Sequence, residues 1–223
     1  MPPPGSERPS RKEVWFKCNR YFLRTIKRED ASQRWAEWLS DPWTVHVLNT
    51  SPVRIGKREI ADYIKQFDQR SRLLLGIFEM GSRLHVGFVR IDLDGAGTAL
   101  VNAVIGEAAH RNRGATTDVF VALLDFLFDT VAVRRVRASV LLRNQVTLAY
   151  LLKLGWQREE APGSPVRSIT DGSALETCML SWTREGYHAF RSTPAGRRVL
   201  RRISTGASAP VRVPKPAAGN EAV

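Results

Sequence analysis

The sequence predicts one α/β domain, of the α+β type, whose sheet is mixed but mostly antiparallel. Three observations predict it. Apolar segments in the centre are separated by short glycine turns. Segments on either side of the centre have apolar residues at helical spacing. A basic glycine turn leads into a strongly apolar helix. The chain has 223 residues, 43% of them hydrophobic, which suffices for one sizeable core.

The first third of the chain predicts one strand and two helices. Residues 21–26 (YFLRTI) have strand character, and residues 28–40 have helical apolar spacing with Asp30 as the cap. Pro42 ends this helix because the residue before a proline is disfavoured in helical conformation. A loop is expected next, and then a second amphipathic helix near residues 57–70.

The centre predicts an antiparallel meander followed by a buried helix. The strands are residues 73–80, 84–93 and 98–107, joined by glycine-containing hairpin turns. After Gly114, residues 117–129 are apolar almost all round. Such a helix must be buried between a sheet and other elements.

The remaining elements alternate between strand and helix. Residues 134–142 alternate as a strand does, and a helix follows with Asn144 as its cap and Gly155 as its terminator. A pair of strands closes the sheet, at residues 156–160 and 175–183. A basic helix broken at Pro194 comes last.

The positive charge gathers at the two ends of the chain. Of the net +12, residues 1–20 carry +3 and residues 184–223 carry +6. Solvated tails explain this distribution better than a nucleic-acid partner, which stays open as a second role for the basic end. The expected divisions are a flexible extension over 1–19, the domain over 20–183, a basic helical extension over 184–206 and a disordered tail over 207–223.

The compartment follows from what the sequence lacks. No window of about 18 apolar residues is present, and the first residues have no apolar signal core. The two cysteines, Cys18 and Cys178, have neither a disulfide framework nor zinc-ligand spacing. We therefore expect a cytoplasmic protein with reduced cysteines, no metal site and no membrane contact.

Three stretches resemble the GCN5-related N-acetyltransferase (GNAT) superfamily, in particular its ribosomal-protein and nucleotide-sugar branch. They are WAEWLSDPWTVHVLN (35–49), IGEAAHRNRGATTD (105–118) and RNQVTLAYLLKLGWQREE (143–160). The resemblance covers residues 20–183. It implies a sheet that splays between the fourth and fifth predicted strands, helices on both faces, and acetyl-CoA as the cofactor.

The glycine turn is also an anion site on physical grounds. Backbone N–H groups before a helix bind anions, and Gly114 lets phosphate oxygens come close to the main chain. Arg111 and Arg113 add formal charge. The resemblance implies that coenzyme A is held by Val104, Ile105, Gly106, Arg111, Asn112, Arg113, Gly114, Ala115, Thr116 and Asn144. Asn112 and Thr116 depart from the family pattern, which favours glycine or alanine there.

The implied reaction is attack of a neutral amine on a thioester. A lysine-like amine costs roughly 4–5 kcal/mol to deprotonate at pH 7, whereas an α-amine costs nearer 1 kcal/mol, so a base matters most for basic acceptors. Glu107 is the first candidate, with the alternative that it pairs Arg111 or the loop amides. Asp92, Asp94 and His46 are the other candidates for the base. A main-chain amide of residues 104–106 is expected to stabilise the oxyanion.

The family often uses a tyrosine on the later helix to protonate the leaving thiolate. Leu151 stands at the matching position and Tyr150 lies one residue earlier, about 100° around the helix, so Tyr150 or water is expected to supply the proton. Trp43, His46 and Asn49 are the acceptor candidates. Trp43 has an alternative as a core anchor, and His46 as an incidental loop residue.

The leading functional hypothesis is an acetyl-CoA-dependent N-acetyltransferase acting on a primary amine of a small molecule, with an amino sugar as first candidate. Acetylation of a protein N-terminus is the alternative within enzymes. A catalytically weak acyl-CoA-binding module, whose arginine-rich end binds nucleic acid or an acidic partner, is the alternative of another class. A homodimer stays open.

Overall fold

A nine-stranded sheet forms the centre of the computed structural model, which describes residues 13–51, 53–111, 113–160 and 163–204. The strand order is β1-β2-β3-β4-β5-β6-β9-β7, and β8 pairs with β9. Every neighbouring pair is antiparallel except β5 and β6. The strands are β1 (Trp15–Cys18), β2 (Tyr21–Thr25), β3 (Arg72–Glu79), β4 (His85–Leu93), β5 (Thr98–Ile105), β6 (Arg135–Leu141), β7 (Gln157–Arg158), β8 (Gly163–Arg167) and β9 (Ala174–Thr183).

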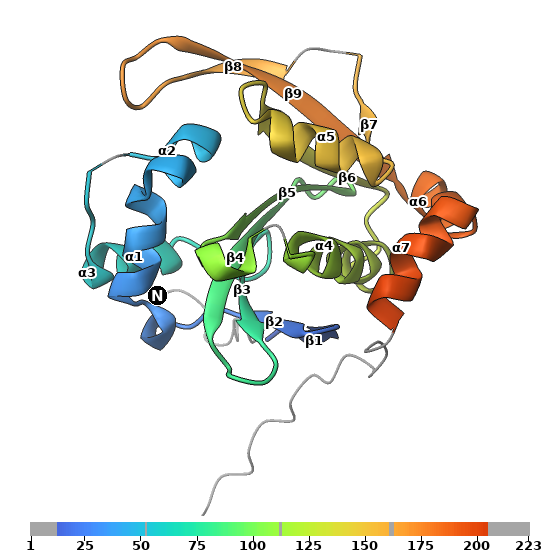
Figure 1. Cartoon of the computed structure of the whole chain (residues 1–223), viewed down its shortest axis with the longest axis horizontal. Coiled ribbons are helices and arrows are strands. Elements are labelled where there is room, and N and C mark those ends of the chain that lie inside the picture. The colour runs from blue at the N-terminus through green and yellow to red at the C-terminus, as the bar shows by residue number, and fades with distance from the viewer. Residues whose placement is uncertain (1–12, 52, 112, 161–162, 205–223) are drawn as a thin grey trace, which may run out of the picture.

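Helices cover both faces of this sheet (Figure 1). One face carries α1 (Gln33–Ser40), α2 (Pro42–Leu48) and α3 (Lys57–Ile64). The other carries α4 (Ala115–Asp125), which continues as a π-helical turn (Phe126–Thr130), and α5 (Gln145–Lys153). After β9 come α6 (Arg184–Arg191) and α7 (Pro194–Ser204). The predicted α/β class and mostly antiparallel sheet are confirmed.

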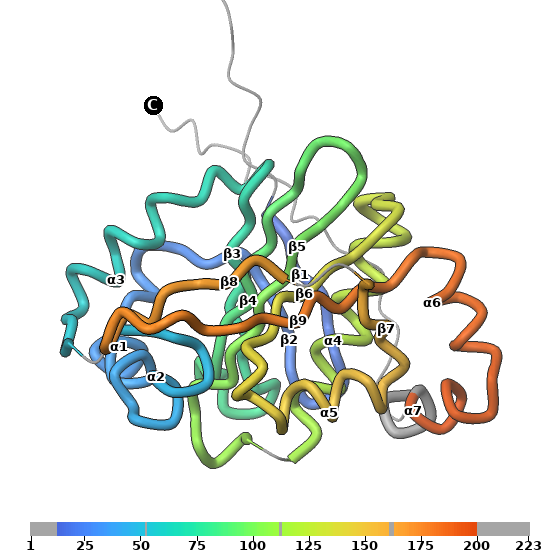
Figure 2. The backbone as a smooth tube through the Cα atoms, turned by 90° about the horizontal axis from the view of Figure 1, so that it is seen from above, coloured from blue at the N-terminus to red at the C-terminus, as the bar shows by residue number. Residues whose placement is uncertain are grey.

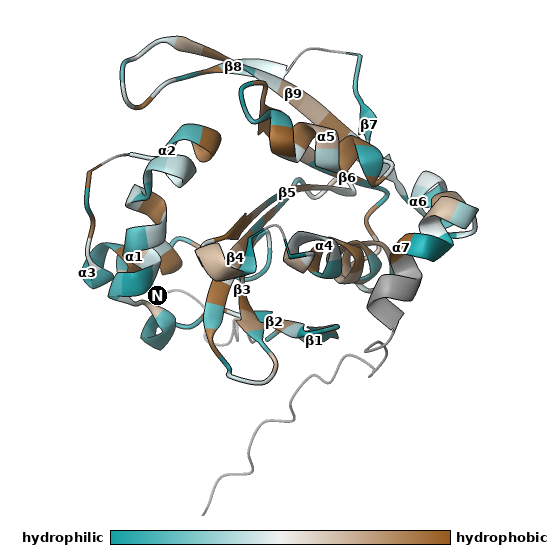
Figure 3. Cartoon of the chain, in the orientation of Figure 1, coloured by the Kyte–Doolittle hydropathy of each residue, from teal (hydrophilic) through white to brown (hydrophobic). Residues whose placement is uncertain are grey.

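Two apolar cores hold the layers together. The larger core packs α4 and α5 onto the sheet, and the smaller packs α1 and α3 onto β2–β5. Apolar residues accordingly line the inner strands and the sheet-facing sides of the helices (Figure 3). The all-round apolar character of α4 is explained, since Val119, Leu123 and Leu127 are fully buried.

The N-terminal boundary of the domain differs from the prediction. Residues 15–18, expected within the flexible extension, form β1 and pair with β2. Phe16 stacks on Phe126 with ring centroids 5.1 Å apart. A four-residue strand has almost no sequence signal, because its stability comes from the partner strand and the core beneath it. Residues 1–12 of the predicted flexible extension and the predicted disordered tail over 207–223 lie outside the described residues.

The predicted loop after residue 41 is in fact α2. Asp41 caps this helix by accepting from the Thr44 N–H at 3.1 Å, and Pro42 occupies its first turn. The proline that ends α1 therefore begins α2, because its fixed φ suits the first helical position. The cap of α1 is Ser32 rather than Asp30, which pairs with Arg24.

The predicted loop between the last two strands contains β8. It forms a hairpin with β9 that reaches across to α2 (Figure 2). Asn49 at the end of α2 holds the hairpin turn, donating to the Arg167 carbonyl at 2.8 Å and accepting from the Ile169 N–H at 2.9 Å. Within the described chain, no helix is long and apolar enough to cross a membrane.

His85 lies inside the smaller core, enclosed by aromatic rings. Its ring centroid is 5.2 Å from Trp35, 5.1 Å from Trp38 and 4.8 Å from Phe78. Neither ring nitrogen has a hydrogen-bond partner in the described structure. Burial lowers the pKa of His85 from 6.5 to about 4.

This depressed pKa predicts a loss of stability in mild acid. Between pH 6.5 and 4 the unfolded chain takes up a proton that folded His85 does not, so the unfolding free energy falls as the pH falls. His85→Phe keeps a ring of similar shape, and we expect its unfolding free energy to fall about 3 kcal/mol less than that of the wild type between pH 7 and pH 4, measured by urea unfolding. Parallel pH dependences of the two proteins would contradict this.

Candidate active site

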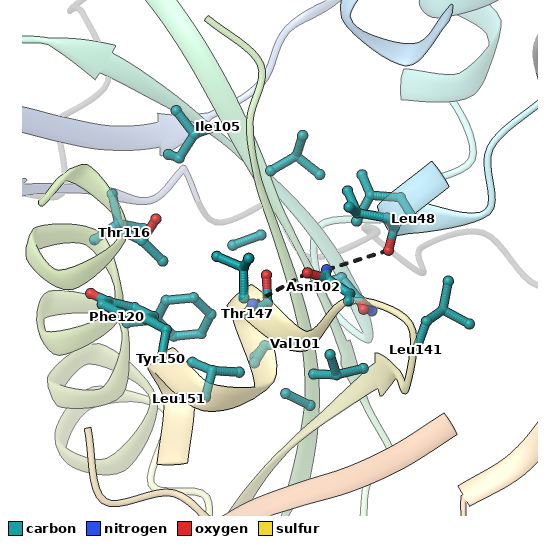
Figure 4. Close-up of a pocket in the computed structure, with 18 of the residues that line it drawn as sticks. Leu48, Val101, Asn102, Ile105, Thr116, Phe120, Leu141, Thr147, Tyr150 and Leu151 are labelled. Atoms are coloured by element: carbon teal, nitrogen blue, oxygen red, sulfur yellow. Dashed lines mark hydrogen bonds between the residues drawn. The ribbon is translucent and has the colours of Figure 1, made fainter. Parts of the chain in front are cut away.

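The parallel strands β5 and β6 part soon after they begin. They pair only at three positions, from Thr98 with Arg135 to Leu100 with Arg137. Beyond these, β5 runs on to Ile105 and β6 to Leu141 without pairing each other. A cavity of about 410 Å³ fills the gap and is also lined by α2, α4 and α5 (Figure 4). The predicted splay between the fourth and fifth predicted strands is thus confirmed, at β5 and β6.

The N-terminus of α4 faces this cavity with free donors. Gly114 precedes the helix in left-handed conformation, with φ of 83°. The N–H groups of Ala115, Thr116 and Thr117 make no hydrogen bond within the described chain, and the first bond of the helix is from Asp118 N–H to the Gly114 carbonyl at 3.0 Å. A Cβ added at Gly114 would meet nothing within 4 Å, so the space is open. These are the features of an anion site.

The hairpin turn between β1 and β2 holds this loop in place. Asn19 Nδ2 donates to Asp118 Oδ2 at 3.2 Å, and Arg20 Nη2 donates to the Arg113 carbonyl at 2.7 Å. Both contacts join residues more than ninety positions apart. The sequence carries no signal for them, because Asn19 and Arg20 resemble ordinary turn residues.

Arg111 has protein partners at the end of β5 and the start of α2. Its guanidinium donates to the carbonyls of Gly106 at 2.6 Å and Ile105 at 3.0 Å, pairs with Asp41 at 3.2 Å, and lies over the Trp43 ring at 4.6 Å. The side chain thus joins the end of β5 to the start of α2. Arg111 also lines the cavity, and its predicted contact with a phosphate stays a prediction.

Arg113 is the loop cation that remains available. Its side chain is exposed, and its guanidinium has no partner in the described part of the chain. Asn112 lies outside the described residues. Thr116 lines the cavity beside Gly114, whereas Ala115 is buried in the core.

Asn144 caps α5, as predicted. Its side chain accepts from the Thr147 N–H at 3.2 Å and donates to the Val47 carbonyl at 3.4 Å, two contacts drawn in Figure 4. It is buried and lines the cavity. Contact with the coenzyme arm stays a prediction.

Tyr150 and Leu151 both line the cavity (Figure 4). The Tyr150 hydroxyl forms a hydrogen bond with Thr117 Oγ1 in the first turn of α4. Burial raises the pKa of Tyr150, so the phenol stays protonated at neutral pH. Leu151 at the family position is almost fully buried and offers no proton.

Glu107 is held by protein partners and does not line the cavity. Arg34 forms a bidentate ion pair with Glu107, in which Nε donates to Oε1 and Nη2 donates to Oε2 at 2.6 Å. Trp38 Nε1 also donates to Oε1, at 2.7 Å. The hydrogen bonds from Arg34 hold the pKa of Glu107 below its usual value, against the effect of burial. A carboxylate held this way is a weak proton acceptor at neutral pH, which argues against the predicted role as base, and its partner is Arg34 rather than Arg111.

The other candidate bases lie outside the cavity as well. Asp92 pairs with Arg72 at 3.1 Å and Arg90 at 2.6 Å. Asp94 accepts from backbone N–H groups of its own turn. His46 is exposed on α2 and does not line the cavity. Among the described residues, no carboxylate or imidazole lines the cavity.

Of the three acceptor candidates, only Trp43 lines the cavity. It is 46% exposed, so it is not the core anchor of the alternative interpretation. Asn49 instead ties α2 to the β8–β9 hairpin. Gly106 is also structural: its N–H donates to the Val86 carbonyl at 2.9 Å, and a Cβ there would lie 2.0 Å from Trp38. Val104 and Ile105 line the cavity, and the role of a main-chain amide there as oxyanion donor stays a prediction.

Sequence reasoning missed the apolar lining of the cavity. It includes Leu48, Val101, Phe120, Leu141 and Val146. In the sequence these residues cannot be told from core positions, because only the parting of two strands makes them line a space.

Comparison with known proteins gives a consistent result. The acetyltransferase (GNAT) domain matches residues 20–157. No curated protein sequence matches the chain significantly. The fold is similar to a GCN5-related N-acetyltransferase from Brucella melitensis, with TM-score 0.67 and 14% identity over 88% of this chain and 87% of that one.

Two further structures share the fold. Spermidine N-acetyltransferase from Vibrio cholerae, in complex with CoA and spermine, has TM-score 0.63 and 16% identity over 76% of this chain and 98% of that one. Ribosomal-protein-S5-alanine acetyltransferase from Vibrio fischeri has TM-score 0.64 and 15% identity over 77% and 97%. Because the family domain matches more than half of this chain, the chain belongs to the GNAT family of acetyltransferases.

Proposed function

We propose that this enzyme transfers the acetyl group of acetyl-CoA to a primary amine of low basicity on a small molecule, with an amino sugar as first candidate. The observation that carries the proposal is the cavity between β5 and β6, which reaches the first N–H groups of α4, and these make no hydrogen bond within the described residues. Enzymes of this family use acetyl-CoA, and this arrangement suits a long ligand with a diphosphate at one end.

The residues present fit the coenzyme. The N–H groups of residues 115–117 and the guanidinium of Arg113 would hold the diphosphate. The apolar cavity would receive the pantetheine arm beside Asn144. When bound, acetyl-CoA supplies an acetyl thioester, which a neutral amine attacks. The protein holds the two reactants together, and oriented pairs of this kind reach effective molarities of about 10⁵ M or more.

The lack of a base in the described cavity lining favours a weakly basic acceptor. Deprotonating a lysine-like or polyamine nitrogen at pH 7 costs roughly 4–5 kcal/mol. No described side chain that lines the cavity can act as a base to offset this cost. An amine with a pKa near that of an α-amine costs about 1 kcal/mol and needs only water as proton acceptor. The amine of an amino sugar belongs to this class. A peptide N-terminus meets the same requirement and remains the second candidate.

Tyr150 is the proposed proton donor to the leaving sulfur. It is the one phenol in the described cavity lining, and its raised pKa keeps it protonated. Thr117, which bonds its hydroxyl, belongs to the first turn of α4. The donor is thus tied to the helix end that would bind the coenzyme.

A charge at position 114 should weaken coenzyme binding. Asn and Asp both tolerate the left-handed backbone of Gly114, and they differ in charge at nearly equal size. We expect Gly114→Asp to raise the dissociation constant of acetyl-CoA about tenfold or more relative to Gly114→Asn, measured by calorimetry. Equal affinities of the two variants would mean that the diphosphate binds elsewhere.

Removing the Tyr150 hydroxyl should slow turnover without loosening the coenzyme. For Tyr150→Phe we expect kcat to fall about 100-fold, while the acetyl-CoA dissociation constant stays near that of the wild type. Thr117→Val, which removes only the hydrogen-bond partner, serves as the control and should have a smaller effect. An unchanged kcat in Tyr150→Phe would assign the proton to water.

The pH dependence should follow the acceptor and not the enzyme. With no base among the described residues that line the cavity, kcat/KM should rise with pH until the acceptor amine is neutral, near pH 8 for an α-amine and above pH 10 for a lysine-like amine. Initial rates for two acceptors of different amine pKa test this. One common inflection below pH 7.5 for both acceptors would reveal a base on the enzyme.

A further inference from the structure

A row of charged side chains crosses the sheet on the face opposite α4. Residues paired directly across strands lie on the same face, and the register pairs Arg72 with Asp92, Asp92 with Leu100, and Leu100 with Arg137. In the next row, Arg90 is opposite Asn102. These positions share the face of Val104, which packs with α1 and α3 in the smaller core.

The cavity opens onto this face. Asn102 and Ser139 line the cavity. Each lies two positions after a residue of the charged row, Asn102 after Leu100 and Ser139 after Arg137, and therefore on the same face of the sheet. The opposite face of the same strands packs on α4 and α5 in the larger core. An acceptor that reaches the cavity from the face of α1–α3 therefore passes Asn102 and the charged row.

Each carboxylate of the row is shared between two arginines. Asp92 pairs with Arg72 and Arg90, and Glu159 of the β7 end pairs with Arg137 and, at 3.8 Å, with Arg135. The four arginines and two carboxylates leave a net charge of +2. The side chains of Arg90 and Arg137 are 39% and 38% exposed, so their charges reach solvent.

Both central arginines keep donors for a ligand. Arg90 uses Nε toward Asp92, and its two terminal nitrogens make no bond in the described chain. Arg137 uses Nε and Nη2 toward Glu159, which leaves Nη1. Their strands flank β5 and their positions are two residues apart along it, so their backbones are about 12 Å apart, a span that two arginine side chains can close around one anionic group.

We propose that this surface, formed by Arg90, Asn102 and Arg137, binds an anionic group, phosphate or carboxylate, carried by the acceptor next to its amine. The proposal rests on the proposed acetyltransferase function and specifies its acceptor. The net positive charge of this surface would repel a polyamine. The Vibrio cholerae enzyme of the same fold, by contrast, binds the polyamine spermine.

Two matched pairs of acceptors test the proposal and distinguish the two anions. They are glucosamine 6-phosphate against glucosamine, and alanylglycine against its amide, with spermidine as the cationic reference. Dissociation constants are measured by calorimetry on the CoA-saturated protein, with kcat/KM where turnover occurs. We expect the anionic member of at least one pair to bind about tenfold more tightly than its neutral partner.

Arg90→Gln and Arg137→Gln should each remove most of that preference and leave the neutral partner unaffected. Neither variant strands a carboxylate, since Asp92 keeps Arg72 and Glu159 keeps Arg135. Arg28→Gln, which removes an exposed charge from the turn before α1, is the control and should keep the wild-type preference.

Three outcomes would overturn the proposal: no preference in either pair, tightest binding of spermidine, or no measurable binding of any probe. Equal losses for anionic and neutral partners in the variants would do the same. Acetyl-CoA binding by the wild type distinguishes failure of this anion-binding proposal from failure of the proposed function. If acetyl-CoA does not bind, the proposed function itself fails.

Discussion

The early end of the β5–β6 ladder is the feature on which the rest of the site depends. Three paired positions keep the two strands in one sheet, and their divergence then creates space inside the molecule. Helices α4 and α5 begin at the edges of that space. The first N–H groups of α4, which make no hydrogen bond in the described structure, and the Asn144 cap of α5 therefore lie at one cavity.

The polar network around Glu107 supports this geometry. Glu107 joins Arg34 and Trp38 of α1 to the end of β5, while Arg111 joins the same strand end to Asp41 and Trp43 at the start of α2. Charged residues that resemble catalytic or phosphate-binding groups thus fix the walls of the cavity. A buried charge needs such partners, since burying it alone is costly.

Charge is divided between the two sides of the parting strands. In the described structure the cavity lining has no acidic group, and the ion pairs of Asp92 and Glu159 on the face of α1–α3 join four arginines to two carboxylates. In the proposed function, the first property favours a weakly basic acceptor amine. In the further inference, the second favours an acceptor with an anionic group next to that amine.

The sequence by itself determined the features that depend on neighbouring residues: the glycine turn before α4, the Asn144 cap, the meander and the order of elements. Short elements such as β1 and β8 escaped it, because four- or five-residue strands exist only with their partners. The roles of Glu107, Arg111 and Asn49 also required the tertiary structure. Each of them has a partner about 70 to 120 positions away, and only packing brings such groups within hydrogen-bond distance.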